Sequence, residues 1–361
     1  MTSIFSKRTM QVRDALAEWQ VDGLLVTNAT NCRWLSGFTG SFCALLITSD
    51  TAVLATDSRY WLQAADQAPD FELFQARRTA QDMARLILSA GVPTIGFEAN
   101  RVTFLQAQEL QAIEGISWKP LNKVLEAMRM VKTADEIGTI QEAAVITDAA
   151  MARVPAFITP GITEAELAWR LEQHMRELGA SGMAFPPIIA FGPNSALPHH
   201  APGERELRED EVILVDMGAK FNGYHSDLTR TYYYGKTADP QFLEIFDIVL
   251  AAQTAALDQI KAGINTVVGH LAAADVINDA GYGDYFGHGL GHGLGLEIHE
   301  IPYLSAIRDP QTIKKDCTIT IEPGIYLPDW GGIRIEDLVQ VTQNGTKPIS
   351  RSPKTSPLIT P

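Results

Sequence analysis

The first third of the chain alternates between helical and strand-like spacing of its apolar residues. From Phe5 to Trp19 the apolar positions recur near the period of a helix, and the apolar run at 23–27 is typical of a strand. The two patterns continue, separated by turn residues, to about residue 120. Further strands are predicted at 43–47, 51–55 and 94–97, and further helices at 80–90 and 103–113. We therefore predict a small α/β domain over residues 1–120.

A second domain is predicted over residues 133–361, after a linker helix at 121–132. Thr133, with Glu136 three residues later, forms a capping box typical of a helix start. The apolar strands between and after the later helices carry most of the histidines, at 199, 200, 288, 292 and 299. The chemistry is therefore expected in this domain. Its long helices are predicted at 135–157, 163–178, 241–261 and 266–280.

The composition excludes several classes of function. The chain is 46% hydrophobic and 20% charged, as in ordinary globular proteins, and its formal charge of −14 argues against nucleic acid or anionic membrane as a partner. No apolar run approaches the roughly 20 residues of a membrane span, and no secretory signal is recognisable. Three cysteines without metal-type spacing indicate reduced, half-buried thiols. These features predict a cytoplasmic protein, with the basic segment 347–354 as a solvated end.

Two aspartates flank a predicted hairpin. Asn222-Gly223 between two strand-like runs is a strong signal for a two-residue turn, and it pairs residues whose numbers sum to 445. Asp216 then lies opposite Thr229, and Asp227 becomes its diagonal neighbour on one face. A buried carboxylate is costly unless its charge is compensated. For this pair alone, a hairpin with one turn-capping and one exposed aspartate is an equally good interpretation.

A second carboxylate pair favours a metal site. Glu322 ends an apolar strand just before Pro323, and a later strand, 332–339, places Arg334 and Glu336 on one face. A structural Arg–Glu pair is the alternative, but it leaves the buried Glu322 unexplained. Four acids at strand positions repel one another unless they are protonated or neutralised by cations. Two divalent ions are the simplest solution.

A glycine-rich segment supplies histidines at fixed intervals, namely His288, His292 and His299. A lone histidine is more often structural than a ligand, but three in one such segment favour a site. The H-E-x-x-H zinc motif is absent, and no cysteine-based zinc site is available. Carboxylates with one or two imidazoles suit Mn²⁺, Co²⁺ or Zn²⁺ alike. His200, His225 and His270 are interpreted as surface or structural residues.

These residues together resemble the "pita-bread" peptidases, which include prolidase, aminopeptidase P and methionine aminopeptidase. The resemblance rests on VDMG at 215–218, SDLTRT at 226–231, GHGLGLEIHE at 291–300, TIEPGIY at 320–326 and RIED at 334–337. It implies a creatinase-like N-terminal α/β domain and a catalytic domain with a pseudo-twofold antiparallel sheet covered by helices. It also implies two divalent ions, Mn²⁺ favoured and Co²⁺ or Zn²⁺ possible. The implied metal ligands are Asp216, Asp227, His292, Glu322 and Glu336.

The resemblance further implies roles for the remaining polar residues. Glu322 acts as general base on a hydroxide that bridges the metals, and His199 and His299 contact the substrate and stabilise the transition state. His288 lines the pocket for the proline side, and Arg334 orients the metal-ligand carboxylates. Segments 34–41 and 56–60 resemble the N-terminal domain of the proline-specific branch. That domain is expected to govern oligomerisation and substrate access, in a homodimer or larger homo-oligomer.

The implied activity is hydrolysis of the bond between an N-terminal residue and proline in small peptides. Many prolidases place an arginine after the His-Glu pair to hold the dipeptide carboxylate, but this chain has Tyr303 there. Arg308 is the candidate replacement, so Xaa-Pro dipeptidase and Xaa-Pro aminopeptidase both remain open. Two other interpretations also remain: a metal-free peptide-binding protein on this fold, and a metallohydrolase that has drifted to another substrate, such as an organophosphate ester.

Overall fold

The computed structural model describes residues 2–77, 79–355 and 357–361, and it divides the chain into two compact units. The first ends at Arg129, and the second is Met130–Pro361. The boundary follows helix α6 (Val124–Arg129), which is shorter than the predicted linker helix. Each unit has its own core and is described by itself.

The first unit is built on one six-stranded mixed sheet, in the order β4-β3-β2-β1-β5-β6. Its core gathers apolar residues of the sheet with Leu86 and Ile87 of α4. The strands and helices predicted for this part are confirmed, and α2, α3, β4 and β6 are additional. The elements are α1 (Ile4–Leu16), β1 (Gly23–Val26), α2 (Ala29–Ser36), β2 (Ala44–Thr48), β3 (Ala52–Thr56), α3 (Trp61–Gln67), β4 (Glu72–Gln75), α4 (Ala80–Ser89), β5 (Thr94–Glu98), α5 (Phe104–Gln111) and β6 (Ser117–Leu121).

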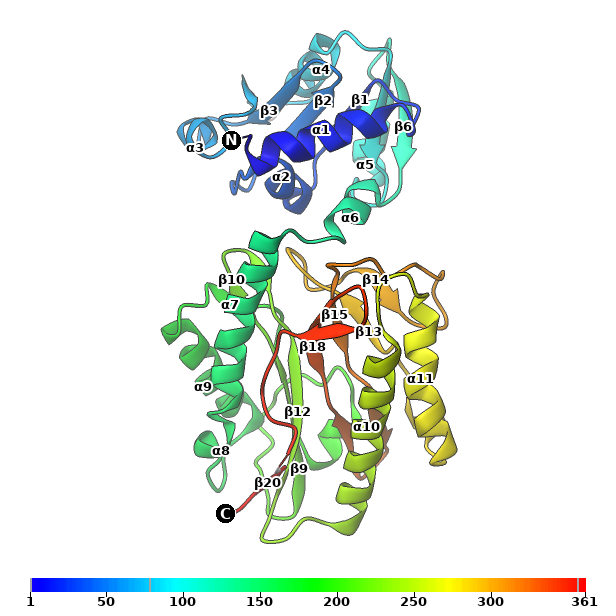
Figure 1. Ribbon diagram of the computed structural model, residues 1–361. Coiled ribbons are helices and arrows are strands. Elements are labelled where there is room, and N and C mark those ends of the chain that lie inside the picture. The colour runs from blue at the N-terminus through cyan, green and yellow to red at the C-terminus, as the bar shows by residue number, and fades with distance from the viewer. Residues whose placement is uncertain (1, 78, 356) are drawn as a thin grey trace. The chain divides into compact units, whose positions relative to one another are not determined.

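The second unit has two helix pairs with strands between them, as Figure 1 shows. α7 contacts α9, and α10 contacts α11. The helices are α7 (Ala134–Met151), α8 (Val154–Phe157), α9 (Glu164–Glu177), α10 (Pro240–Gln259) and α11 (Thr266–Asp279). The strands are β7 (Gly182–Met183), β8 (Ile188–Phe191), β9 (Glu211–Met217), β10 (Ala219–Phe221), β11 (Tyr224–His225), β12 (Leu228–Tyr234), β13 (Gly291–Gly293), β14 (Glu300–Leu304), β15 (Thr318–Ile321), β16 (Gly324–Leu327), β17 (Gly331–Arg334), β18 (Asp337–Val341), β19 (Thr346–Pro348) and β20 (Leu358–Ile359).

Each helix pair of the second unit is followed in the chain by one long hairpin. The α7–α9 pair precedes the β9–β12 hairpin, and the α10–α11 pair precedes the hairpin that runs from β15 to β18. Both hairpins are antiparallel. The repeated order of two helices and a hairpin gives this unit its two-halved, pseudo-symmetric architecture, and the resemblance to the pita-bread fold is borne out by this arrangement.

Two predicted elements are interrupted where a proline removes a backbone donor. The predicted helix 135–157 ends at Met151, because Pro155 has no N–H to give and its ring conflicts with the carbonyl four residues earlier. The predicted strand 332–339 is two strands, β17 and β18, which pair with β16 and β15. On the opposite strand the interruption falls at Glu322 and Pro323, and proline cannot donate to the ladder.

Two predictions about the end of the chain and the thiols are wrong. The segment 347–354 is not a solvated end, because Lys354 Nζ lies 2.7 Å from Asp337 Oδ2 and Arg230 donates to the carbonyls of Ser352 and Pro353. Asp337 and Arg230 thus hold residues 352–354 on the domain, while Lys347 and Arg351 are exposed. The three cysteines are free but buried, not half-buried.

Candidate metal centre

The β9–β12 hairpin brings Asp216 and Asp227 together. The predicted register is confirmed, since Thr229 pairs with Asp216 and Lys220 with His225. Asn222 and Gly223 have φ values of 46° and 81°, as a two-residue hairpin turn of this hand requires. Gly218 has to be glycine, because a Cβ there would lie 1.9 Å from the Ser226 carbonyl oxygen. The close approach of the two strands fixes the aspartates on one face.

The second hairpin brings Glu322 and Glu336 together at its interruption. Ile321 pairs with Asp337 on one side of the break, and Gly324 pairs with Arg334 on the other. The same register places Glu322 directly opposite Glu336. The gap that Pro323 makes in the ladder is therefore occupied by two facing carboxylates.

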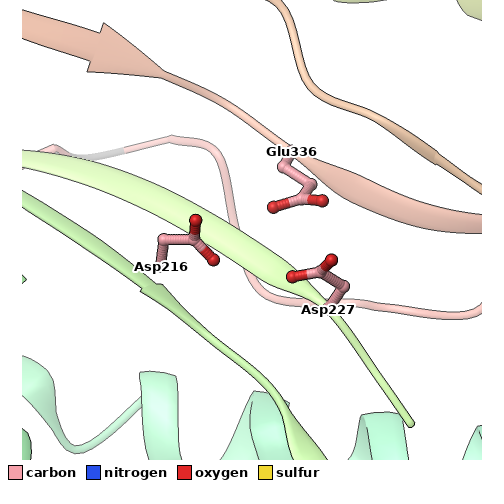
Figure 2. Close-up of side chains that lie close together, drawn as sticks. All are labelled: Asp216, Asp227 and Glu336. Atoms are coloured by element: carbon pink, nitrogen blue, oxygen red, sulfur yellow. The ribbon is translucent and has the colours of Figure 1, made fainter. Parts of the chain in front are cut away.

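The acids of the two hairpins converge in the interior. Oxygens of Asp216, Asp227 and Glu336 lie within 4.8 Å of one another, and Figure 2 shows the three carboxylates turned toward a common point. His292 Nε2 lies 3.6 Å from Asp227 Oδ2 and 3.4 Å from Glu322 Oε1. The structure thus brings together all five residues predicted as metal ligands.

This cluster fits a bound cation on the evidence of its own unmatched oxygens. Among the described residues, Asp216 Oδ1 and Glu336 Oε1 are buried and have no hydrogen-bond partner. Buried polar atoms are normally paired, so two unpaired carboxylate oxygens directed into one acidic cluster indicate cation ligands. Carboxylates with one imidazole form an oxygen-rich donor set that suits divalent ions.

One buried cationic side chain reaches the cluster but cannot neutralise it. Arg334 Nη2 donates to Asp216 Oδ2 at 2.6 Å, and Arg334 Nε donates to Thr229 Oγ1 at 3.1 Å. The Thr229 hydroxyl in turn donates to Glu336 Oε2 at 2.7 Å. Arg334 thus fixes one acid of each hairpin. A single guanidinium faces four acids, so charge remains for metal ions to balance.

Burial perturbs every acid of the cluster in the same direction. Desolvation raises the pKa of the Asp227 and Glu336 carboxyls well above their usual range, with mutual repulsion adding to it. Desolvation also raises the pKa of Asp216, against the opposing effect of Arg334, and raises the pKa of Glu322 to about 8. In the absence of a cation, burial therefore favours the protonated form of each acid, and a metal must displace the protons that are bound.

The stability of the metal-free protein is therefore expected to fall as pH rises from about 6.5 to about 8. An acid whose folded pKa is raised binds more protons in the folded than in the unfolded state, so folding stability declines between its ordinary value and its folded pKa. For Glu322 that window runs from 4.5 to about 8. Below about 6.5 the buried histidines, whose pKa values are lowered, contribute the opposite slope.

Thermal melts of chelator-treated protein between pH 6.5 and 8 measure this slope. Saturating Mn²⁺ is expected to abolish it, because metal-bound carboxylates are deprotonated throughout. A melting temperature of the metal-free protein that stays constant or rises over the window contradicts the buried acid cluster.

The histidines of the glycine-rich segment are neutral and differently engaged. Burial, followed by the neighbouring His299, lowers the pKa of His292 to about 3, and its Nδ1 donates to the Gly293 carbonyl at 3.0 Å. Its Nε2 lone pair is then free to face the acids, as in a metal-ligating histidine. His299 packs edge-on against His292, with ring centroids 4.4 Å apart. Burial likewise lowers the pKa of His288 to about 4.

A cavity of about 740 Å³ opens onto the acids. Every residue predicted for the site lines it. Besides the four acids and His292, the lining residues include His199, His288, His299, Tyr303, Arg308 and Arg334. Of the three histidines interpreted as surface or structural, His200 also lines the cavity. His225 Nδ1 donates to the Gly295 carbonyl, and His270 stacks on Phe286.

Sequence reasoning missed two residues that support the wall. The Tyr326 hydroxyl accepts from Arg334 Nη1 at 2.8 Å and donates to His288 Nε2 at 2.9 Å, so it joins the arginine to the histidine. Burial raises the pKa of Tyr326 to about 12, which keeps the phenol protonated. Strand alternation from Glu322 places Tyr326 on the same side of the chain, and this was the available signal. Thr229 is the second, and its position opposite Asp216 in the predicted hairpin pointed to it.

Comparison with known proteins gives two family matches. The description "Metallopeptidase family M24" applies to residues 138–343, and "Creatinase/Prolidase N-terminal domain" applies to residues 8–131. An Xaa-Pro dipeptidase of Pyrococcus horikoshii is 32% identical over 353 residues, 97% of this chain and 98% of that protein. In the described part of the chain, no helix combines the length and apolarity that a membrane span requires.

Two solved structures are similar to this chain over nearly its full length. An Xaa-Pro dipeptidase from Bacillus anthracis has a TM-score of 0.95 at 37% identity, covering 98% of this chain and 99% of that one. An X-Pro aminopeptidase from Thermotoga maritima MSB8 has a TM-score of 0.89 at 34% identity, covering 98% and 99%. The relatives thus include both kinds of exopeptidase.

Proposed function

The chain belongs to metallopeptidase family M24, in its proline-specific branch, and from that premise we propose that it hydrolyses the bond between an N-terminal residue and a following proline. The observation that supports the proposal is that the five residues predicted as ligands lie in one cluster that lines the cavity. A metal-free binding protein on this fold has no need for two unpaired buried carboxylate oxygens.

We propose that the five ligands hold two divalent ions, with Mn²⁺ favoured over Co²⁺ and Zn²⁺. The ions supply a water of lowered pKa and a Lewis acid for the scissile carbonyl. Asp216 and Glu336 contribute the unpaired oxygens, while Arg334 and Thr229 hold their other oxygens in place. His292 presents its Nε2 and stays neutral, because its pKa is low.

The protein's own groups then handle the proton and the developing charge. Glu322, whose Oε1 accepts from Thr320 Oγ1 at 3.1 Å, takes the proton of the attacking water and delivers it toward the leaving proline nitrogen. His199 and His299 donate hydrogen bonds to the substrate carbonyl as it gains charge. The Xaa-Pro bond has no N–H. Recognition therefore falls to a pocket for the ring, of which His288 is a part.

Arg308 on the cavity wall is a candidate binding site for the substrate's C-terminal carboxylate, which favours the dipeptidase. The Arg308 guanidinium lies 4.3 Å from the centroid of the Tyr303 ring, and both residues line the cavity. Tyr303 is thus the platform on which Arg308 is held, where a planar guanidinium can take a carboxylate in two hydrogen bonds. We propose that Arg308 binds the C-terminal carboxylate of an Xaa-Pro dipeptide.

Arg308→Met is expected to raise KM for Xaa-Pro dipeptides about 10- to 100-fold with little change in kcat, since one charge-assisted contact of about 1.5–3 kcal/mol is lost. Hydrolysis of an Xaa-Pro-Yaa-Zaa peptide should change far less. Steady-state kinetics on both peptides measure the split. If Arg308→Met raises KM equally for both peptides, Arg308 does not bind the C-terminal carboxylate.

The decisive test of the function is release of the free N-terminal residue from the two peptides by Mn²⁺-loaded protein, with a chelated control. Metal-dependent cleavage that strongly favours the dipeptide supports the dipeptidase. Cleavage of the longer peptide at an equal or higher rate makes the protein an aminopeptidase and refutes the role proposed for Arg308. No cleavage of either, with no stoichiometric metal, supports the peptide-binding alternative. Metal content without cleavage favours another substrate.

A further inference from the structure

A fully buried carboxylate that has no role in the proposed chemistry binds the chain segment that carries His199. Glu164, in the first turn of α9, is 0% exposed. Its Oε1 accepts from the Phe191 backbone N–H at 2.9 Å and from Asn194 Nδ2 at 2.8 Å. Its Oε2 accepts from His200 Nε2 at 2.8 Å and from the Gly203 backbone N–H at 3.1 Å. One side chain thus takes four hydrogen bonds from a single segment, 191–203.

That segment carries His199. It leaves β8 at Phe191, makes a short 3-10 turn over Gly192–Ala196, and then continues without regular structure to Gly203. His199 itself is exposed and lines the cavity. A segment without its own backbone ladder is held in place by side chains, and here the main one comes from α9.

A second anchor acts on the other side of the segment. The Gly332 backbone N–H donates to Ser195 Oγ at 2.8 Å, and Arg334 Nη1 donates to the Pro198 carbonyl at 3.5 Å. A Cβ at Gly332 would lie 2.2 Å from the Ser195 carbonyl oxygen, so the segment packs directly on β17. The backbone next to His199 is therefore fixed between α9 and the strand that carries Arg334.

We propose that Glu164 and His200 are positioning residues that hold His199 at the substrate. This inference rests on the proposed function, in which His199 is a hydrogen-bond donor. His200 directly follows His199, and its bond to a buried carboxylate fixes the peptide unit between the two residues. Small misplacements of a reacting group can cost about 10²-fold in rate.

His200→Ala is expected to lower kcat for the Xaa-Pro substrate about 10- to 100-fold while leaving metal content and KM nearly unchanged. His200→Gln, whose amide can donate to Glu164 in place of the imidazole, should restore most of the loss. His174→Ala is the matched control, because His174 forms a looser pair with Glu177 on the same helix, at 3.5 Å, and should have no effect.

A double-mutant cycle separates positioning from direct contact, since His200 also lines the cavity. If His200 acts through His199, the double variant with both replaced by alanine should be no slower than His199→Ala alone. Losses that multiply mean that His200 touches the substrate itself, and they overturn the proposal.

Hydrogen exchange tests the same inference without using activity. Both His200→Ala and Glu164→Gln should raise amide exchange in 191–203 by at least about tenfold, with exchange in β9 and β12 unchanged. Unchanged exchange in 191–203 overturns the proposal, even in an inactive protein. An inactive parent in which exchange does rise refutes the proposed function but not the positioning of this segment. His200→Ala serves where Glu164→Gln fails to fold.

Discussion

Asp227→Asn is expected to abolish metal loading and, with it, activity, by more than about 10³-fold, because the chemistry depends on metal-activated water. The same variant should melt higher than the parent when both are metal-free. Burial and the neighbouring Glu336, Asp216 and Glu322 destabilise the Asp227 carboxylate, so folding without metal must either protonate this group or bury its charge, and a neutral amide of the same shape avoids that cost. Each 1 kcal/mol gained raises the melting temperature by about 2–4 °C.

Elemental analysis and paired thermal melts with chelator and with Mn²⁺ measure both effects. Asp337→Asn provides the contrast. Asp337 is also buried, but it pairs with Arg230 and Lys354 at 2.8 and 2.7 Å, so its replacement removes the carboxylate that balances the buried Arg230 guanidinium and the half-buried Lys354 ammonium. It should lower the melting temperature of the metal-free protein. A metal-replete, active Asp227→Asn variant eliminates the proposed centre.

Glu322→Gln is expected to lower kcat by about 10²–10⁴-fold while the substrate still binds. The amide keeps the size of the side chain and its contact with Thr320 but cannot take a proton from water. General acid–base groups typically contribute an effect of this size. Single-turnover kinetics with an Xaa-Pro dipeptide, beside equilibrium binding of the same peptide, separate the lost step from lost affinity.

Metal content decides how the Glu322→Gln result is interpreted. If the variant retains manganese and loses turnover, Glu322 is the proton acceptor. If it loses manganese as Asp227→Asn does, its role is that of a ligand alone. Near-parental turnover with metal bound assigns the proton transfer to another group, with His299 the first candidate, because it lies beside His292 on the cavity wall.

The acid cluster could be predicted because two local sequence signals, a hairpin turn and acids at strand ends, indicate which distant residues lie close together. A two-residue turn at Asn222-Gly223 fixes the register of the whole hairpin, and with it the neighbours of Asp216 and Asp227. Apolar strands that end in an acid then mark Glu322. Because the cost of burying charge is large, four such acids predict their own convergence without any knowledge of the fold.

Other features were beyond these rules because they depend on tertiary contacts. The break between β17 and β18 is caused by Pro323 on the opposite strand, and period-2 alternation along residues 332–339 cannot reveal it. Glu164 is an acid in the first turn of a helix, where acids are common for local reasons. Its four donors come from a segment that no periodicity links to α9. The ion pair of Lys354 likewise depends on Asp337, which directly follows the predicted ligand Glu336 in the chain.

The division of the acids between the two hairpins has a consequence for the stability of the domain. Each half supplies two carboxylates, so an ion held by both acts as a removable cross-link between segments far apart in the chain. Like a disulfide, such a link restrains the chain, but its strength is set by ion concentration relative to the dissociation constant. Loss of the proposed metal ions is therefore expected to lower both the activity and the stability of this domain, to an extent set by the free metal concentration.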